Sequence, residues 1–166
     1  MNKMARIESS ILVPKTVEES FLFLNTRESH LKFIPRITEF NQTSVGPFGQ
    51  VGATVGGVLR YFGLNISVDY EIIEHKPNKS LAMKGKMGLV LFRDGYILSP
   101  ESGGTRIIFW LELTLTGLTI FFQPSARLIG KIHAWETLRN LKRELALWHP
   151  SSNEEIASSP LRSSSQ

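Results

Sequence analysis

Residues 105–148 are TRIIFWLELTLTGLTIFFQPSARLIGKIHAWETLRNLKRELALW, and the spacing of their apolar side chains changes part-way along. Over residues 105–115 apolar residues recur at every second position, which is typical of a strand with one buried face. Over residues 125–148 the apolar spacing becomes three or four, which predicts a helix about 36 Å long. Pro124 suits the first turn of that helix, and Pro150 prevents its continuation. We therefore expect a strand followed by one long closing helix.

The predicted helix has one apolar stripe, which is expected to face the rest of the domain. The stripe consists of Leu128, Ile132, Trp135, Leu138, Leu141, Leu145 and Trp148. Five basic residues against two acidic ones give the helix +3 of the chain's formal net charge of +4. Beside Phe121 and Phe122, such a helix could make transient contact with an anionic membrane. A solvated helix face is the simpler interpretation.

Polar and apolar residues also alternate over most of residues 36–115, which predicts a run of antiparallel strands. Residues 64–75 show the pattern most clearly. The side chains expected on the buried face of that strand are Ile66, Val68, Tyr70 and Ile72. The expected strands are residues 37–41, 53–61, 64–75, 80–87, 89–98 and 105–115, with a hairpin loop over 99–104.

One strand and two short helices are expected before this region. Residues 5–13 are rich in β-forming residues and end at Pro14, which predicts a strand. Thr16 and Glu19 have the spacing of a capping box, so a helix is expected from there to Asn25. A second helix over 26–33 should end before Pro35. The order β-α-α-β6-α predicts an α+β fold, with helices on one side of an antiparallel sheet.

The composition suits one globular domain. The chain has 166 residues, of which 42% are hydrophobic, so it can bury a core. It has no cysteine, which excludes disulfides, thiol catalysis and cysteine-based metal sites. We expect one folded domain over residues 1–148. Residues 149–166 are rich in serine and poor in large apolar residues, which predicts a disordered tail.

Several common functional motifs are missing from the sequence. The four histidines lack the short spacing of a metal site, so no metal is expected. There is no Gly-x-Ser-x-Gly elbow, and the glycines of residues 46–57 lead into a strand, so no nucleotide or other cofactor is expected. No RNA-binding motif is recognisable, which argues against a nucleic-acid partner. Without a signal peptide or an apolar membrane-spanning stretch, we expect a soluble, cytoplasmic protein.

Short pieces at the turns of the predicted fold resemble those of a known superfamily. They are VPKTVEESF at residues 13–21, FIP at 33–35, GQVGAT at 49–54, and LSP and GGT at 98–100 and 103–105. With the order of elements, they resemble the START and polyketide-cyclase/dehydrase-like (SRPBCC) superfamily, whose fold is the helix-grip. The birch-pollen-allergen type also belongs to it. The resemblance covers residues 5–148 and implies a curved sheet wrapped around the long helix, with a cavity for an apolar or amphipathic small molecule.

Alternation along the strands predicts which side chains would line that cavity. They are Val68, Tyr70, Leu81, Met83, Phe92, Tyr96, Phe109 and Leu111 on the sheet, opposite Ile132 and Trp135 on the helix. A fully packed core made of the same residues is the alternative.

Asp94 is the unusual residue of this face. Strict alternation with Tyr96 would direct its carboxylate inward, where burial would raise its pKa toward the value that a general base needs near neutral pH. The simpler expectation is a β-bulge at Gly95 that turns Asp94 outward, or pairing with Arg93 or Arg60.

His133, beside the helix stripe, could act as an acid or base near the cavity mouth, although a surface or packed histidine is the simpler expectation. The catalytic candidates are thus Asp94, Tyr96 and His133.

Three functions fit these observations. The favoured hypothesis is binding or transport of a hydrophobic small molecule (a lipid, polyketide or quinone-like compound) in an internal cavity. The alternative is a polyketide cyclase or dehydratase that uses the same cavity without metal or nucleotide cofactor, with Asp94 or a tyrosine as base. The third is an interaction module that binds a protein or membrane through its sheet or its basic helix.

Overall fold

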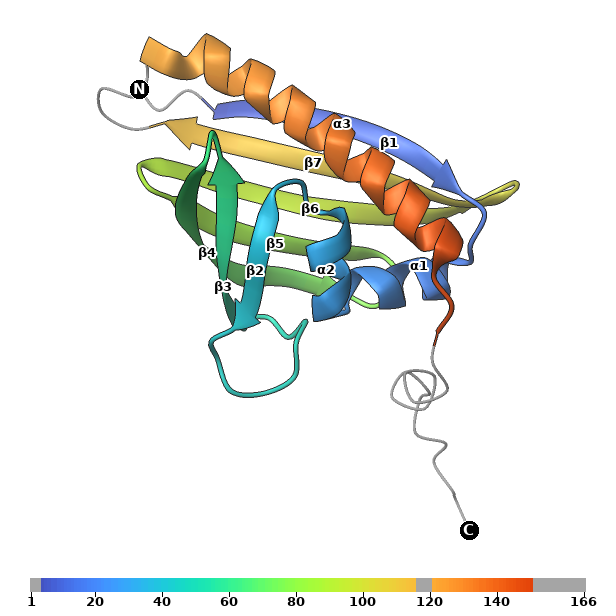
Figure 1. Ribbon diagram of the computed structural model, residues 1–166. Coiled ribbons are helices and arrows are strands. Elements are labelled where there is room, and N and C mark those ends of the chain that lie inside the picture. The colour runs from blue at the N-terminus through green and yellow to red at the C-terminus, as the bar shows by residue number, and fades with distance from the viewer. Residues whose placement is uncertain (1–3, 116–120, 151–166) are drawn as a thin grey trace.

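The computed structural model describes residues 4–115 and 121–150, which form seven strands and three helices. The elements are β1 (Met4–Val13), α1 (Val17–Leu24), α2 (Arg27–Phe33), β2 (Ile37–Gln42), β3 (Thr54–Tyr61), β4 (Leu64–Lys76), β5 (Ser80–Met87), β6 (Val90–Glu101), β7 (Gly104–Leu115) and α3 (Gln123–Leu147). The strands form one antiparallel sheet in the order β1-β7-β6-β5-β4-β3-β2 (Figure 1). The predicted α+β fold and order of elements are confirmed.

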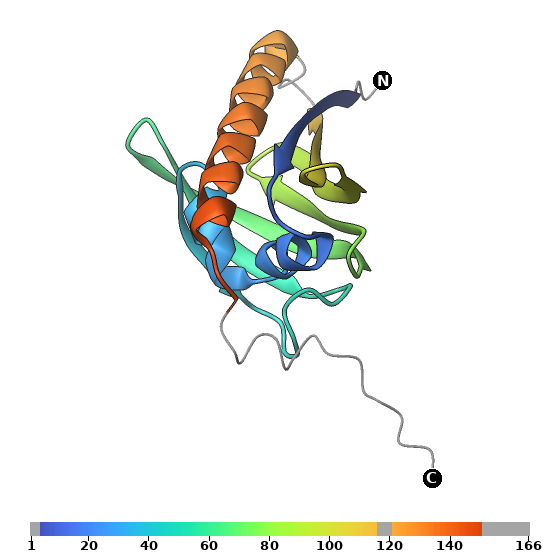
Figure 2. The ribbon, with the colours of Figure 1, turned by 90° about the vertical axis from the view of Figure 1, so that its right-hand side faces the viewer.

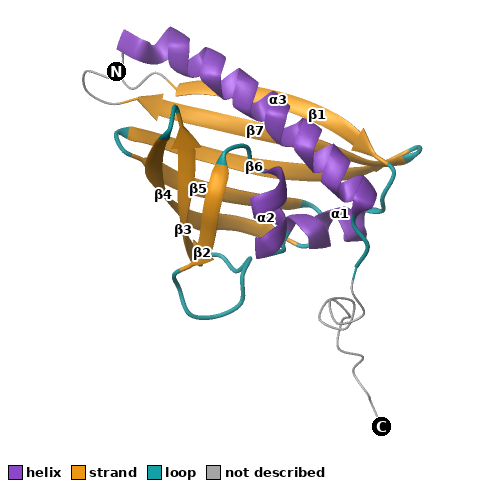
Figure 3. Ribbon diagram, in the orientation of Figure 1, coloured by secondary structure: helices purple, strands orange, loops and turns teal. Residues whose placement is uncertain are grey.

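The sheet is strongly curved, and the three helices lie on its concave side (Figure 3). The long helix α3 packs mainly on β1, β7 and α2, and the short helix α2 packs on β2. In the view turned by 90°, the β3–β4 hairpin projects on one side of α3 and β1 lies on the other (Figure 2). The sheet therefore reaches both sides of α3, as expected for a sheet wrapped around a helix.

The helix α1 begins with the predicted capping box. Oγ1 of Thr16 accepts a hydrogen bond from the amide of Glu19 (3.1 Å), and Oε2 of Glu19 accepts one from the amide of Thr16 (2.9 Å). We expect Thr16→Ala to lower the free energy of unfolding by about 1 kcal/mol, because the amide of Glu19 loses its partner. Urea denaturation measures this, and Thr16→Ser should recover most of the loss. An equal loss in both variants would show that the hydroxyl is not responsible.

The hairpin between β6 and β7 is tighter than predicted. β6 continues to Glu101, which pairs with Gly104, so the predicted loop over 99–104 is wrong. Pro100 is tolerated within the strand because the pairing with β5 ends at Ile97. Beyond that point β6 pairs only with β7. Proline lacks an amide hydrogen, but on the unpaired edge of the strand no hydrogen bond is lost.

The first half of α3 turns a different face to the sheet from the one predicted. Gly130 and Ala134 are buried there, and a Cβ on Gly130 would lie 2.6 Å from Cδ1 of Ile7 on β1. The prediction that Ile132 and Trp135 face the concave side is wrong, because these side chains are 45% and 58% exposed. The helix lies so close to β1 and β7 that only small residues fit between them.

In the second half of α3 the predicted stripe is confirmed, since Leu138, Leu141 and Leu145 are buried. No helix among the described residues is both long enough and apolar enough to cross a membrane. Residues 151–166, most of the predicted tail, lie outside the described residues, so the tail stays a prediction.

Candidate functional site

The predicted lining residues of the strands all lie on the concave face of the sheet, because residues paired across strands share a face. They are Val68, Tyr70, Leu81, Met83, Phe92, Tyr96, Phe109 and Leu111. Gly85 leaves room between two of them: the ring of Phe92 occupies the place of a Cβ at Gly85 and meets the ring of Tyr70 edge-on, with centroids 5.4 Å apart. Their contact with a ligand stays a prediction.

Asp94 lies on the same face, in a row with Met83 of β5 and Leu111 of β7. The register of β6 runs through Gly95 without a shift, so the expected bulge is absent and the prediction that Asp94 turns outward is wrong. Oδ1 of Asp94 is buried and has no hydrogen-bond partner among the residues that the structure describes. Burial raises the pKa of Asp94 to about 7. Near neutral pH this carboxyl group can therefore both accept and donate a proton.

Two buried tyrosines accompany Asp94. Burial raises the pKa of Tyr70 and of Tyr96, and the negative charge of Asp94 contributes to both shifts. Both hydroxyl groups therefore stay protonated near neutral pH. The ring of Tyr96 is held against Phe33 and Phe109, with centroids 6.0 and 5.1 Å apart. The structure thus brings together the predicted candidates Asp94 and Tyr96, and adds Tyr70.

His133 lies beside an ion pair instead of within this group. Arg36, just before β2, donates hydrogen bonds to both carboxylate oxygens of Glu136 on α3, at 2.5 and 3.1 Å. Burial, together with the positive charge of Arg36, lowers the pKa of His133 to about 4. The imidazole is therefore neutral at neutral pH. No group of three His, Asp or Glu side chains that could hold a metal ion is found among the described residues.

The concave face is closed at one end and accessible at the other. Near α1 and α2 its side chains, such as Leu81 and Phe109, are buried. Toward the turn between β5 and β6, five concave-face side chains keep some surface exposed to solvent. They are Met87, Val90, Phe92, Asp94 and Leu113, and we call them the open end. Solvent therefore reaches an apolar part of the concave face up to Asp94.

A pocket of about 290 Å³ lies between α3 and the β3–β4 hairpin. It is lined by Arg36, Tyr61, Phe62, Ile129 and Ile132. Ile132 thus lines a pocket at the edge of the fold rather than the concave face. Except for Ile132, these residues were not predicted from the sequence. The available signal was the Phe62-Gly63 turn, which places a large apolar side chain at a hairpin tip.

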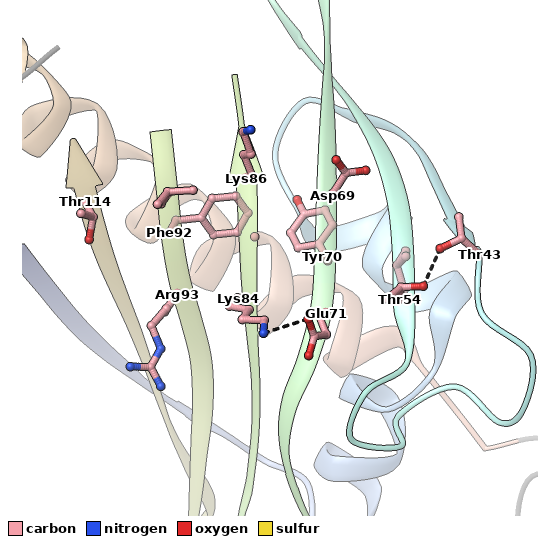
Figure 4. A pocket seen from close by; sticks show the side chains of 13 residues that line it. Thr43, Thr54, Asp69, Tyr70, Glu71, Lys84, Lys86, Phe92, Arg93 and Thr114 are labelled. Carbon is pink, nitrogen blue, oxygen red and sulfur yellow. Dashed lines mark hydrogen bonds and ion pairs between the residues drawn. The ribbon is translucent and has the colours of Figure 1, made fainter. Parts of the chain in front are cut away.

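A larger depression, of about 600 Å³, lies on the outer face of the sheet (Figure 4). It is lined by Thr43, Thr54, Val55, Asp69, Tyr70, Glu71, Lys84, Gly85, Lys86, Leu91, Phe92, Arg93 and Thr114. Nζ of Lys84 lies 2.8 Å from Oε2 of Glu71, and the hydroxyl groups of Thr43 and Thr54 are hydrogen-bonded at 2.7 Å. Charged groups of both signs flank this depression, but most of the surface that lines it is apolar.

The chain is similar in fold to known proteins, although no family model and no curated protein matches it. One similar solved structure is the ZhuI aromatase/cyclase from Streptomyces sp. R1128, at 11% identity and a TM-score of 0.71, covering 87% of this chain and 94% of that one. The di-domain ARO/CYC StfQ from the steffimycin biosynthetic pathway has 13% identity and a TM-score of 0.72. The match covers 87% of this chain and 51% of that one. Ara h 8.0201 has 13% identity and a TM-score of 0.68, and the match covers 88% of this chain and 100% of that one.

At these identities the likeness establishes the fold. The chain has the helix-grip fold that the sequence resemblance predicted, and shares it with these three proteins.

Proposed function

We propose that the protein binds an apolar or amphipathic small molecule at the open end of the concave face. The observation that carries the proposal is the solvent-accessible apolar surface of Met87, Val90, Phe92 and Leu113. A ligand that covers this surface gains about 25 cal/mol for each Å² removed from water. Asp94, at the inner limit of this surface, would interact with a polar group of the ligand. A lipid, polyketide or quinone-like compound has this combination of an apolar body and a polar group.

The binding site can be tested with Nile red, a neutral apolar fluorophore whose emission rises in apolar surroundings. Val90 points to the open end, and its neighbour Leu91 lies on the outer face. We expect Val90→Trp to weaken Nile red binding about tenfold or more, because the larger ring fills the open end, which is a loss of about 1.4 kcal/mol. Leu91→Trp, the matched control, should bind the dye like the unmodified protein.

Equal affinity in Val90→Trp and Leu91→Trp would contradict the proposed site. A separate experiment, native mass spectrometry of the protein purified from its own cells, would identify the natural ligand. Binding without chemical change would appear as a co-purified compound that is released intact on unfolding.

A second function, catalysis, is favoured by one observation: Asp94, with a pKa of about 7, shares the concave face with Tyr70 and Tyr96, and its charge raises the pKa of both. As a carboxylate, Asp94 could remove a proton from a carbon next to a carbonyl group. As an acid, it could protonate a departing hydroxyl group, so that water leaves and a double bond forms. Two of the similar structures are named aromatase/cyclases, which agrees with this chemistry. Asp94→Asn should then abolish dehydration of a poly-β-ketone substrate while Nile red still binds.

A further inference from the structure

The tip of the β3–β4 hairpin exposes large apolar side chains at a strained position. Phe62 and Gly63 form the two-residue turn, both with positive φ (50° and 80°), and the side chain of Phe62 is 99% exposed. Asn-Gly is the usual sequence for such a turn, because a bulky residue rarely adopts a positive φ. Leu64, directly after the turn, is also exposed. Neither packing nor turn chemistry accounts for a phenylalanine at this position.

The first half of α3 continues this apolar surface. Ile129 and Ile132 line the 290 Å³ pocket together with Phe62, so the hairpin tip and the helix border the same hollow. Leu128 and Trp135 are exposed on the adjoining outer side of the helix. We call Phe62, Leu64, Leu128, Ile129, Ile132 and Trp135 the apolar rim. An apolar surface that joins two elements in this way is typical of an interaction site.

The charges around the apolar rim are basic. Arg127 and Lys131 are exposed on the first half of α3. Arg139, one turn beyond Trp135, is also exposed, and its guanidinium lies 4.6 Å from the ring centre of Trp135. The nearby acidic residue, Glu136, is neutralised by its ion pair with Arg36. A second copy of the chain would bring these basic groups against one another. An anionic surface would complement them, and protruding Phe and Trp side chains suit insertion among lipid headgroups.

We propose that the apolar rim and its flanking basic residues dock the protein on the surface of an anionic lipid bilayer. Phe62 and Ile132 insert at the level of the headgroups, and Arg127, Lys131 and Arg139 contact lipid phosphates. The docking does not depend on the proposed ligand. Gly130, between Ile129 and Ile132, lies against Leu113 of the open end, so a docked molecule holds that end close to the membrane. An apolar ligand could then pass from the bilayer to the concave face along a short path.

Vesicle co-sedimentation of the full-length protein tests this proposal. One set of vesicles contains equal parts of phosphatidylcholine and phosphatidylglycerol, and the other contains phosphatidylcholine alone. We expect the protein to bind the anionic vesicles about tenfold more strongly, and added salt to weaken that binding. We expect Phe62→Asn combined with Ile132→Gln to reduce binding about tenfold. Both positions are exposed, and asparagine suits the turn better than phenylalanine, so the variant should fold.

The matched control is Leu147→Gln, which removes an exposed apolar side chain at the other end of α3 and should bind the vesicles normally. Equal loss in the control and in the double variant would overturn the assignment of the rim. Equal binding to both kinds of vesicle, or a dimer in sedimentation that the double variant abolishes, would also overturn it. The double variant leaves Val90 and the open end unchanged, so it should still bind Nile red. Loss of vesicle binding with normal Nile red binding would therefore test the docking surface separately from the proposed ligand site.

Discussion

Replacing Asp94 by asparagine is expected to stabilise the protein by about 2 kcal/mol above neutral pH and to have little effect at about pH 4. Burial raises the pKa of Asp94 from 3.8 to about 7. Between these values the unfolded chain has lost the proton that the folded chain keeps, so the stability of the protein falls as the pH rises from about 4 to about 7. The full shift would correspond to about 4 kcal/mol, and we expect about half because Asp94 as a residue keeps some exposed surface, although its Oδ1 is buried. Asparagine carries no charge, so the variant does not lose stability over this pH range.

Urea denaturation at about pH 4 and about pH 8.5 measures the effect, since the fall in stability begins near the first value and is complete at the second. Asp69→Asn is the matched control, because Asp69 is exposed on the outer face of β4. It should change stability little at either pH. A stabilisation by Asp94→Asn that is the same at both pH values would contradict an ionisation effect and would indicate a change in packing.

The strands and their faces could be predicted from the sequence because a period of two leaves only two choices of face. Asp94 is the position at which two rules disagreed. Alternation with Tyr96 directed it inward, whereas the cost of burying a carboxylate favoured an outward turn at Gly95. The structure follows alternation, because β6 pairs with β5 on one side and β7 on the other, and a bulge would disturb both ladders. The sequence around Asp94 contains no sign of this two-sided constraint.

The contacts of α3 could be predicted only for its second half. The first half offers two faces at helical spacing, one with the large side chains Leu128, Ile132 and Trp135 and one with Gly130 and Ala134. Hydrophobicity favours burial of the large residues. In the structure the small residues are buried instead, because they let α3 lie closer to β1 and β7. That distance depends on the whole fold and cannot be obtained from the helix alone.

Substitution of Gly130 by leucine is expected to lower the free energy of unfolding by about 3 kcal/mol, even though leucine gains about 1 kcal/mol over glycine in helix propensity. The first atom added, a Cβ, would lie 2.6 Å from Cδ1 of Ile7 and 3.1 Å from Cδ1 of Leu113, so the helix must move away from the sheet.

The comparison variants are Ile132→Ala and Trp135→Ala, which should each change stability by about 0.5 kcal/mol or less, because these side chains are exposed. Urea denaturation of the three variants distinguishes the two faces of α3. If the large residues were the buried ones, the two alanine variants would each lose about 2–5 kcal/mol and Gly130→Leu would be tolerated. The same displacement of α3 would widen the space above Leu113, so Gly130→Leu should also alter Nile red binding at the open end, whereas Ile132→Ala should not.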